Sequence, residues 1–182
     1  MFNKFELIGG AASILSMALA LYLIQAGDYL AQVGEEPQVA QVVGSNDKII
    51  VVPQGENANQ LRADAYVAAT DNKGNIKRMV VDDIKIGTGA EVQEGDTVSV
   101  HYVGKLQNGQ EFDASKKRGE AFEFKVGAGR VIQGWEEGVV GMRAGGERVL
   151  VIPPEKAYGE AGIGPIPGNA TLIFSIELLE IK

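Results

Sequence analysis

The sequence contains no cysteine and a single histidine, His101. Without thiols the chain has no disulfide, no thiolate nucleophile and no cysteine-ligated zinc or iron–sulfur site. One histidine still permits a serine–histidine pair, but it excludes a metal site built on several histidines. Nucleophilic and metal-dependent chemistry therefore has few candidate residues in this protein, and no metal or cofactor is expected.

An excess of positive charge is also absent. The 182 residues carry 17 Lys and Arg against 24 Asp and Glu, a formal net charge of -7, and no segment is basic. A protein that binds nucleic acid needs a basic face to displace the counterions of the phosphate backbone. We therefore expect no nucleic-acid partner.

One long apolar run stands near the N-terminus. Residues 7–24 are 18 residues without a charge, which as a helix would span about 27 Å, close to the thickness of the bilayer core. The pattern predicts a transmembrane helix within an N-terminal segment, residues 1–30. A cleaved signal peptide and a buried core helix are the alternatives, and the first would give a secreted form.

The charges on either side of this run predict its orientation. Lys4 precedes it, whereas Asp28 and Glu35 follow it. By the positive-inside rule the N-terminus lies in the cytoplasm. The rest of the chain is then extracytoplasmic, in the periplasm or an equivalent space.

Residues 31–79 show no sustained hydrophobic period and are interpreted as a tether with limited local structure. Within them, a short strand is predicted at 48–53 and a marginal helix at 58–70. A partner-binding or dimerising segment is the alternative.

From residue 80 to 182 the pattern is that of a folded domain. Alternating or β-rich segments predict strands at 97–102, around Phe112, and at 122–126, 148–152 and 171–181. The apolar residues Ile132, Trp135, Val139 and Met142 are spaced as one face of a short helix. Strands that outnumber helices in this way indicate an α+β domain, with an antiparallel sheet folded over one helix.

A search for ionisable active-site groups in this domain finds little. His101 lies in a predicted strand, and no serine stands on a nucleophile elbow, so His101 is interpreted as structural. Glu136 and Glu137 are neighbours on a helix, point about 100° apart and are expected on a solvated face. The glycine-rich stretches lack the Lys-Ser/Thr pair of a phosphate-binding loop.

What remains is a set of aromatic residues inside recognisable motifs. Three segments carry them: VSVHYVGKLQNGQEFDAS (98–115), FKVGAGRVIQGWEEGVVGM (124–142) and PEKAYGEAGIGPIPGNATLIFSIELL (154–179). Together, and in this order, they resemble the FKBP family of peptidyl-prolyl cis-trans isomerases over about residues 80–182. The resemblance implies a five-stranded antiparallel sheet wrapped around one short helix, with a proline pocket between them.

The resemblance also implies roles for individual residues. Trp135 matches the pocket floor, and Asp113 matches the carboxylate beside the pocket. Tyr158 matches a hydroxyl that binds the substrate backbone. The residues expected to be catalytic are Tyr102, Phe112, Asp113, Trp135, Tyr158 and Phe174.

A second group is expected to bind substrate around that pocket. Val131 and Ile132 match its rim, where the backbone N–H after the valine binds a substrate carbonyl. Arg118 is the expected ion-pair partner of Asp113. The full group is Arg118, Phe122, Val131, Ile132 and Ile166, the last on the flap from 159 to 169.

Some positions depart from the family pattern. The flap is about one residue shorter than in well-known members, Ile163 stands near a position where some carry histidine, and Gly168 replaces a second proline. Arg130 stands where some members have an acid, which bears on the preference for residues that flank proline.

An apolar pocket suits the implied reaction. Rotation about an X-Pro bond breaks no covalent bond, so it needs no nucleophile or metal, and a dry aromatic site favours the less dipolar, twisted amide. We therefore expect an isomerase that acts on proline-containing segments of exported proteins. The resemblance alone implies that macrolides inhibit it. A proline-binding module or scaffold with incidental catalysis is the alternative.

Overall fold

The computed structural model describes residues 41–42, 49–55 and 58–182. The predicted membrane-spanning segment, residues 7–24, lies outside these residues. Residues 31–40, 43–48 and 56–57 of the predicted tether lie outside them as well. Over the ranges that are described, no helix is long and apolar enough to cross a bilayer.

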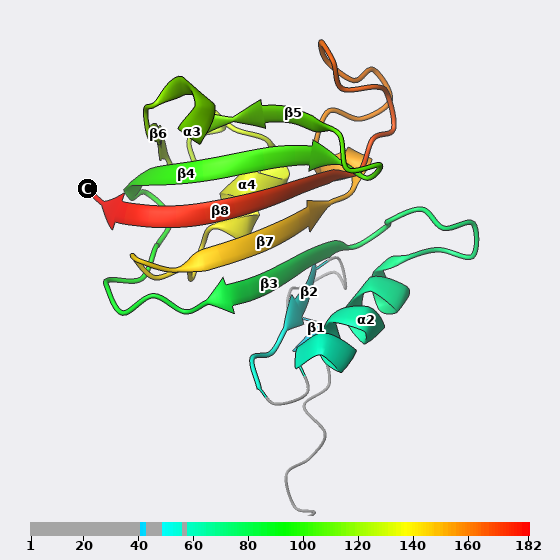
Figure 1. Cartoon of the computed structure of the whole chain (residues 1–182), viewed down its shortest axis with the longest axis horizontal. Helices are drawn as coiled ribbons and strands as arrows, with labels where there is room; N and C mark the ends of the chain where they lie inside the picture. Colours follow the sequence, from blue (N-terminus) through cyan, green and yellow to red (C-terminus); the bar gives the residue numbers. More distant parts are fainter. Residues whose placement is uncertain (1–40, 43–48, 56–57) are drawn as a thin grey trace, which may run out of the picture. The chain divides into compact units, whose positions relative to one another are not determined.

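The described strands form one mixed sheet (Figure 1). Its order is β1-β2-β3-β7-β8-β4-β5, and β6 also pairs with β4. In chain order the strands are β1 (Gln41–Val42), β2 (Ile49–Val52), β3 (Met79–Lys85), β4 (Thr97–Leu106), β5 (Glu111–Ala114), β6 (Phe122–Lys125), β7 (Glu147–Ile152) and β8 (Leu172–Ile181). The helices are α2 (Ala58–Ala69), α3 (Ser115–Arg118), α4 (Gln133–Gly138) and the 3-10 helix η1 (Pro154–Lys156).

The predicted five-stranded antiparallel sheet is wrong in its strand count and in one strand direction. Eight strands are present in the described part of the chain, and β2 runs parallel to β3. The five predicted strand segments are all strands, and the α+β class is confirmed. The sequence analysis predicts no strand over the residues of β3. The first four residues of this strand are all buried. Such a strand shows no alternation because both of its faces are covered.

Helix α4 packs closely on the inner face of the sheet. A Cβ atom at Gly134 would lie 2.4 Å from the Ile152 side chain, and one at Gly138 would lie 2.6 Å from that of Leu150. Only glycine allows the helix to approach β7 so closely. This contact fixes the position of Trp135, which lies between the two glycines on the same helix and is 4% exposed.

Helix α2 packs on the outer face of the sheet, over β2 and β3 (Figure 1). Leu61, Ala65 and Ala69 form a buried stripe at four-residue spacing, which is the pattern of one helix face. They pack with Ile50 and Val80 in a second hydrophobic cluster, separate from the inner core. Since neighbouring residues of a strand point to opposite faces, Val80 faces α2 while Met79 and Val81 face the inner core.

This outer layer differs from the tether expected over 31–79. The predicted strand and helix are both present, as β2 and α2, and they belong to the packed unit. Arg62 of α2 also donates a 2.6 Å hydrogen bond to the buried carboxylate of Asp82 on β3. The sequence alone predicts only a marginal helix here, because the stability of α2 depends on this tertiary packing.

Candidate functional site: an aromatic pocket

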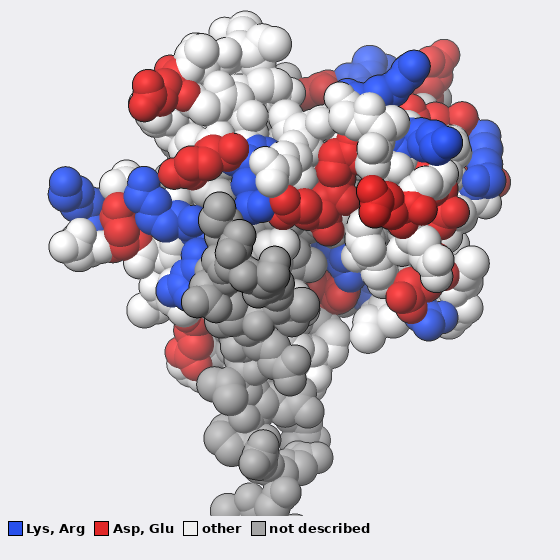
Figure 2. All heavy atoms as spheres, turned by 180° about the vertical axis from the view of Figure 1, so that it is seen from behind, with Lys and Arg blue, Asp and Glu red and all other residues white. Residues whose placement is uncertain are grey.

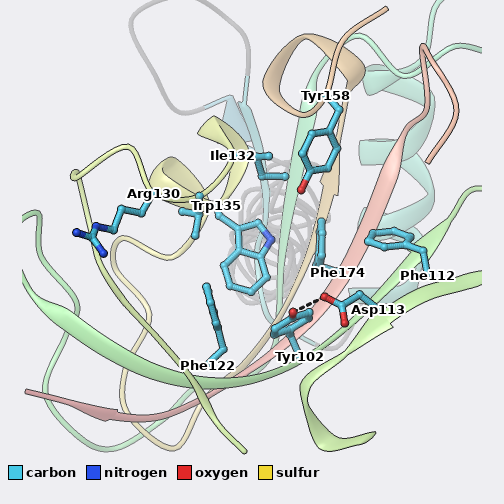
Figure 3. Close-up of a pocket in the computed structure, with 10 residues that line it drawn as sticks. Tyr102, Phe112, Asp113, Phe122, Arg130, Ile132, Trp135, Tyr158 and Phe174 are labelled. Atoms are coloured by element: carbon cyan, nitrogen blue, oxygen red, sulfur yellow. Dashed lines mark hydrogen bonds between the residues drawn. The ribbon is translucent and has the colours of Figure 1, made fainter. Parts of the chain in front are cut away.

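A small cavity of about 170 Å³ opens between the sheet and α4 (Figure 3). Pockets for drug-sized ligands usually have about 300–1,000 Å³, so this one has room for a single small ring. Its walls are mostly aromatic and aliphatic side chains. They are Tyr102, Phe112, Asp113, Phe122, Arg130, Val131, Ile132, Trp135, Tyr158 and Phe174.

The lining residues come from distant parts of the chain. Tyr102 lies on β4, Phe112 on β5, Phe122 on β6 and Phe174 on β8. Strand pairing brings these four together, because β4 is hydrogen-bonded to β5, β6 and β8. The site is thus assembled around one central strand.

Trp135 is the floor against which the other rings stand. Its ring centroid lies 5.1 Å from that of Tyr102 and 5.2 Å from that of Phe174, and both pairs are perpendicular at 89°. Phe122 approaches at 6.0 Å and 79°. Edge-to-face pairs of this kind are favourable and hold the rings in fixed orientations. The pocket is therefore a preformed apolar surface.

One corner of the pocket is polar. The hydroxyl of Tyr102 donates to the carboxylate of Asp113, which also forms an ion pair with Arg118. Arg118 donates a second hydrogen bond, of 2.8 Å, to the Tyr102 oxygen. The three groups form a closed set, in which the carboxylate charge is already compensated.

The pKa of Asp113 is lowered from its ordinary value. Partial burial of the carboxyl raises the pKa, but the hydrogen bonds from Tyr102 and Arg118 and the charge of Arg118 outweigh that effect. Burial raises the pKa of Tyr102, and the Asp113 carboxylate adds to this rise. At neutral pH the corner therefore holds an ionised acid and a neutral phenol.

Tyr158 stands at the mouth of the pocket, directly after η1. Figure 3 shows its hydroxyl turned toward the cavity, on the side away from Phe122. The side chain is 37% exposed. Burial of the remainder and the charge of Asp113 raise the pKa of this phenol as well.

Most of the residues predicted from the sequence meet at this pocket. All six expected catalytic residues line it, as do Phe122, Val131 and Ile132. Arg118 is not a lining residue, but it contacts two of them, through an ion pair with Asp113 and a hydrogen bond to Tyr102. Ile166 differs: it is 7% exposed and packs into the inner core, outside the lining set.

Arg130 lines the pocket, although the sequence analysis did not place it among the binding residues. Its position next to Val131, at the expected rim, is the sequence feature that could have indicated this role. The sequence shows that its charge differs from the family pattern, but whether the side chain lines the cavity depends on the loop conformation.

His101 and the two glutamates lie outside the pocket lining. His101 Nδ1 is 3.0 Å from the Ser115 hydroxyl, in agreement with its expected structural role. The solvated face expected for Glu136 and Glu137 is wrong, because both are half-buried and bonded. Glu136 accepts a 2.5 Å hydrogen bond from the Gly127 N–H, and Glu137 pairs with the buried Lys156.

No group of three or more metal-ligating side chains occurs among the described residues. Glu136 and Glu137 are bound to a loop N–H and to a lysine, respectively. What the site offers chemically is an apolar floor, a neutralised carboxylate and phenol hydroxyls at the edge.

Comparison with known proteins identifies relatives of this domain. Residues 89–179 match the family profile described as FKBP-type peptidyl-prolyl cis-trans isomerase. The chain is 56% identical over 107 residues to "FK506-binding protein 4" of Gibberella zeae, a match that covers 59% of the chain and 21% of that protein. It is 61% identical over 90 residues to "FK506-binding protein 2" of Emericella nidulans, covering 49% of the chain and 67% of that protein.

A solved structure is similar as well. The structure titled "Crystal structure of AtFKBP13" matches with a TM-score of 0.55 and 37% identity, over 63% of this chain and 98% of the other. By contrast, the chain spans only about a fifth of the length of the first of these relatives.

Proposed function

The chain belongs to the FKBP-type peptidyl-prolyl cis-trans isomerase family, and on that premise we propose that it accelerates rotation about X-Pro bonds in polypeptides. The proline ring of the substrate would enter the aromatic pocket. The size of the pocket fits this proposal, since a cavity of about 170 Å³ has room for one small ring.

The pocket lowers the barrier by being apolar and preformed. An X-Pro bond rotates over about 18–20 kcal/mol, because the planar amide must lose its conjugation. The planar amide is strongly dipolar and the twisted one is less so. A dry aromatic surface therefore destabilises the planar form relative to the transition state, which is the differential binding that catalysis requires.

The observation that carries this proposal is the compensated carboxylate. Asp113 is the single acid on the pocket wall, and it is held by Tyr102 and Arg118. A group so engaged is poorly suited to act as a general base, but it fixes the Tyr102 ring against Trp135. Such an arrangement suits a reaction without proton transfer, such as rotation about an X-Pro bond.

Two groups at the rim are suited to hold the substrate backbone. The Ile132 N–H donates to no described group, while the Ile132 carbonyl accepts from the first turn of α4. The Tyr158 hydroxyl also faces the cavity (Figure 3). We propose that these two donors bind substrate carbonyls and orient the bond that rotates.

The test is a protease-coupled assay of cis-to-trans isomerisation with the full-length chain in mild detergent and a short X-Pro peptide. We expect kcat/KM within about 10⁴–10⁸ M⁻¹s⁻¹, the usual range of enzymes. Tight binding of the peptide by folded protein without turnover would instead identify a proline-binding module.

The pKa values of the pocket predict a flat pH profile. The lowered pKa of Asp113 keeps it ionised above its ordinary value near 4, and the raised pKa values of Tyr102 and Tyr158 keep both phenols neutral below about pH 9. We expect kcat/KM to vary less than about twofold between pH 5 and 9. A limb in the rate profile between pH 6 and 7 would contradict the flat profile.

Because the folded-state pKa of Asp113 is lowered, its contribution to the stability of the fold is present above pH 4 and is lost as the pH falls through that lowered value.

The names of the relatives suggest an inhibitor. Two of them are called FK506-binding proteins, and we propose that FK506 binds in the same pocket and inhibits turnover. The flap from 159 to 169 directly follows the lining residue Tyr158 and departs from the family pattern at Ile163 and Gly168, so the affinity of FK506 tests how far the flap contributes. Uninhibited turnover at saturating FK506 would remove this part of the proposal.

We also propose that residues 7–24 anchor the protein in a membrane, with the isomerase domain on the extracytoplasmic side and exported proteins as substrates. The support is the uncharged length of this segment and the position of Lys4 before it. Extraction of membranes with carbonate should leave the chain in the pellet, and protease added outside should cut it. Release into the soluble fraction would overturn the anchor.

A further inference from the structure

The pocket carries one charge that has no partner. Asp113 and Arg130 are the charged residues on its wall, and Asp113 is compensated by Arg118. Arg130, by contrast, makes no ion pair and no side-chain hydrogen bond with any residue of the described ranges. The side chain is exposed. In a protein with a net charge of -7, an unpaired guanidinium beside the pocket is a local reversal of charge.

The backbone beneath Arg130 is held in place. Gly127 and Gly129 adopt φ values of +80° and +66°, which favour glycine, and the Gly127 N–H is bound by Glu136. Glu94 packs on the other side of Gly127, where an added Cβ would lie 2.8 Å from its Cγ atom. The loop therefore presents Arg130 from a fixed point, next to the rim residue Val131.

The direction of the side chain limits what it can contact. Figure 3 shows Arg130 extending away from Trp135, with its guanidinium beyond the floor of the pocket. A ring bound on Trp135 would not touch it. A residue adjacent to that ring would lie about 3.3–3.6 Å further along an extended chain.

From these observations we propose that Arg130 selects substrates with an acidic side chain next to the proline. This rests on the proposed isomerase function and names the class of substrate that the site prefers. A carboxylate is the natural partner of a guanidinium, which can bind both of its oxygens. The net negative charge of the protein opposes acidic peptides at long range, but at about 0.1 M salt this repulsion is screened beyond about 10 Å while the close contact persists.

The test uses peptides that differ only beside the proline. Two series carry Glu, Gln or Lys, one directly before and one directly after the proline, and kcat/KM is measured with the full-length chain. We expect Glu to exceed Gln by about twofold to fivefold in at least one series, the size typical of an exposed ion pair, and Lys to fall below Gln. Higher salt should reduce the difference.

Charge reversal supplies the decisive comparison. Arg130→Glu should invert the order of Glu and Lys, whereas Lys125→Glu, the same change at an exposed residue outside the pocket lining, should leave the order as in the wild type. Fluorescence of Trp135, the single tryptophan of the chain, verifies that each variant is folded. Turnover of the Gln peptides with no ranking by charge overturns this inference alone. No turnover of any peptide by folded wild-type protein overturns the proposed function.

Discussion

Replacing Trp135 with leucine should lower kcat/KM for X-Pro isomerisation by about tenfold to a hundredfold, the equivalent of roughly 1.4–2.8 kcal/mol in transition-state stabilisation. The indole is the floor on which the proline ring would rest, and three aromatic walls stand perpendicular or nearly perpendicular to it. Leucine fills less of this volume and offers no edge to the neighbouring rings, which then lose their fixed orientation. The coupled assay with one Gln-Pro peptide measures the loss.

The variant must be shown to fold, since Trp135 is also part of the inner core. Val139→Ala is a matched control. Val139 lies just beyond α4, is 1% exposed and belongs to the same core, yet it does not line the pocket. Its loss should destabilise the domain while kcat/KM of the folded protein stays within about twofold of wild type. Wild-type kcat/KM in folded Trp135→Leu protein would show that this pocket does not perform the reaction.

The aromatic site was accessible from sequence because its residues lie in motifs that resemble a known family. Tyr102 lies in an alternating strand, and Trp135 lies on a short helical face between two glycines. These patterns predict the strand and the helix face, whereas the resemblance to the FKBP family implied that the side chains converge on a pocket. Nine of the eleven site residues that the resemblance implied line the cavity.

The parts that escaped prediction depend on contacts between distant segments. Strand β3 shows no alternation because α2 covers one of its faces and the core the other. The sequence predicts that Glu136 is solvated, because the loop that places the Gly127 N–H against its carboxylate cannot be predicted from the local pattern. Likewise Ile166 is on the flap in sequence, but the flap turns at Ile163 and Ile166, which pair with each other, and the second side chain enters the core.

Ile50→Ala should lower the free energy of unfolding by about 2–5 kcal/mol, the usual cost of removing a buried isoleucine side chain. Ile50 is 1% exposed and lies in the outer cluster with Leu61, Ala65 and Val80. If residues 49–79 were a tether, the same change would cost little, because a tether has no packing to lose. Denaturant unfolding followed by Trp135 fluorescence measures the difference.

The comparison with Val67→Ala makes the result specific to packing. Val67 lies on α2 but is 76% exposed, so its truncation should change the free energy of unfolding by less than about 0.5 kcal/mol. Because Ile50 and Trp135 lie on opposite sides of the sheet, Ile50→Ala should also leave kcat/KM of the folded protein unchanged. Equal, small effects of both substitutions would mean that the outer layer does not stabilise the domain. A large effect of Ile50→Ala alone would place the start of the folding unit before β3, so that a fragment beginning at residue 80 would lack β2, α2 and the first residue of β3.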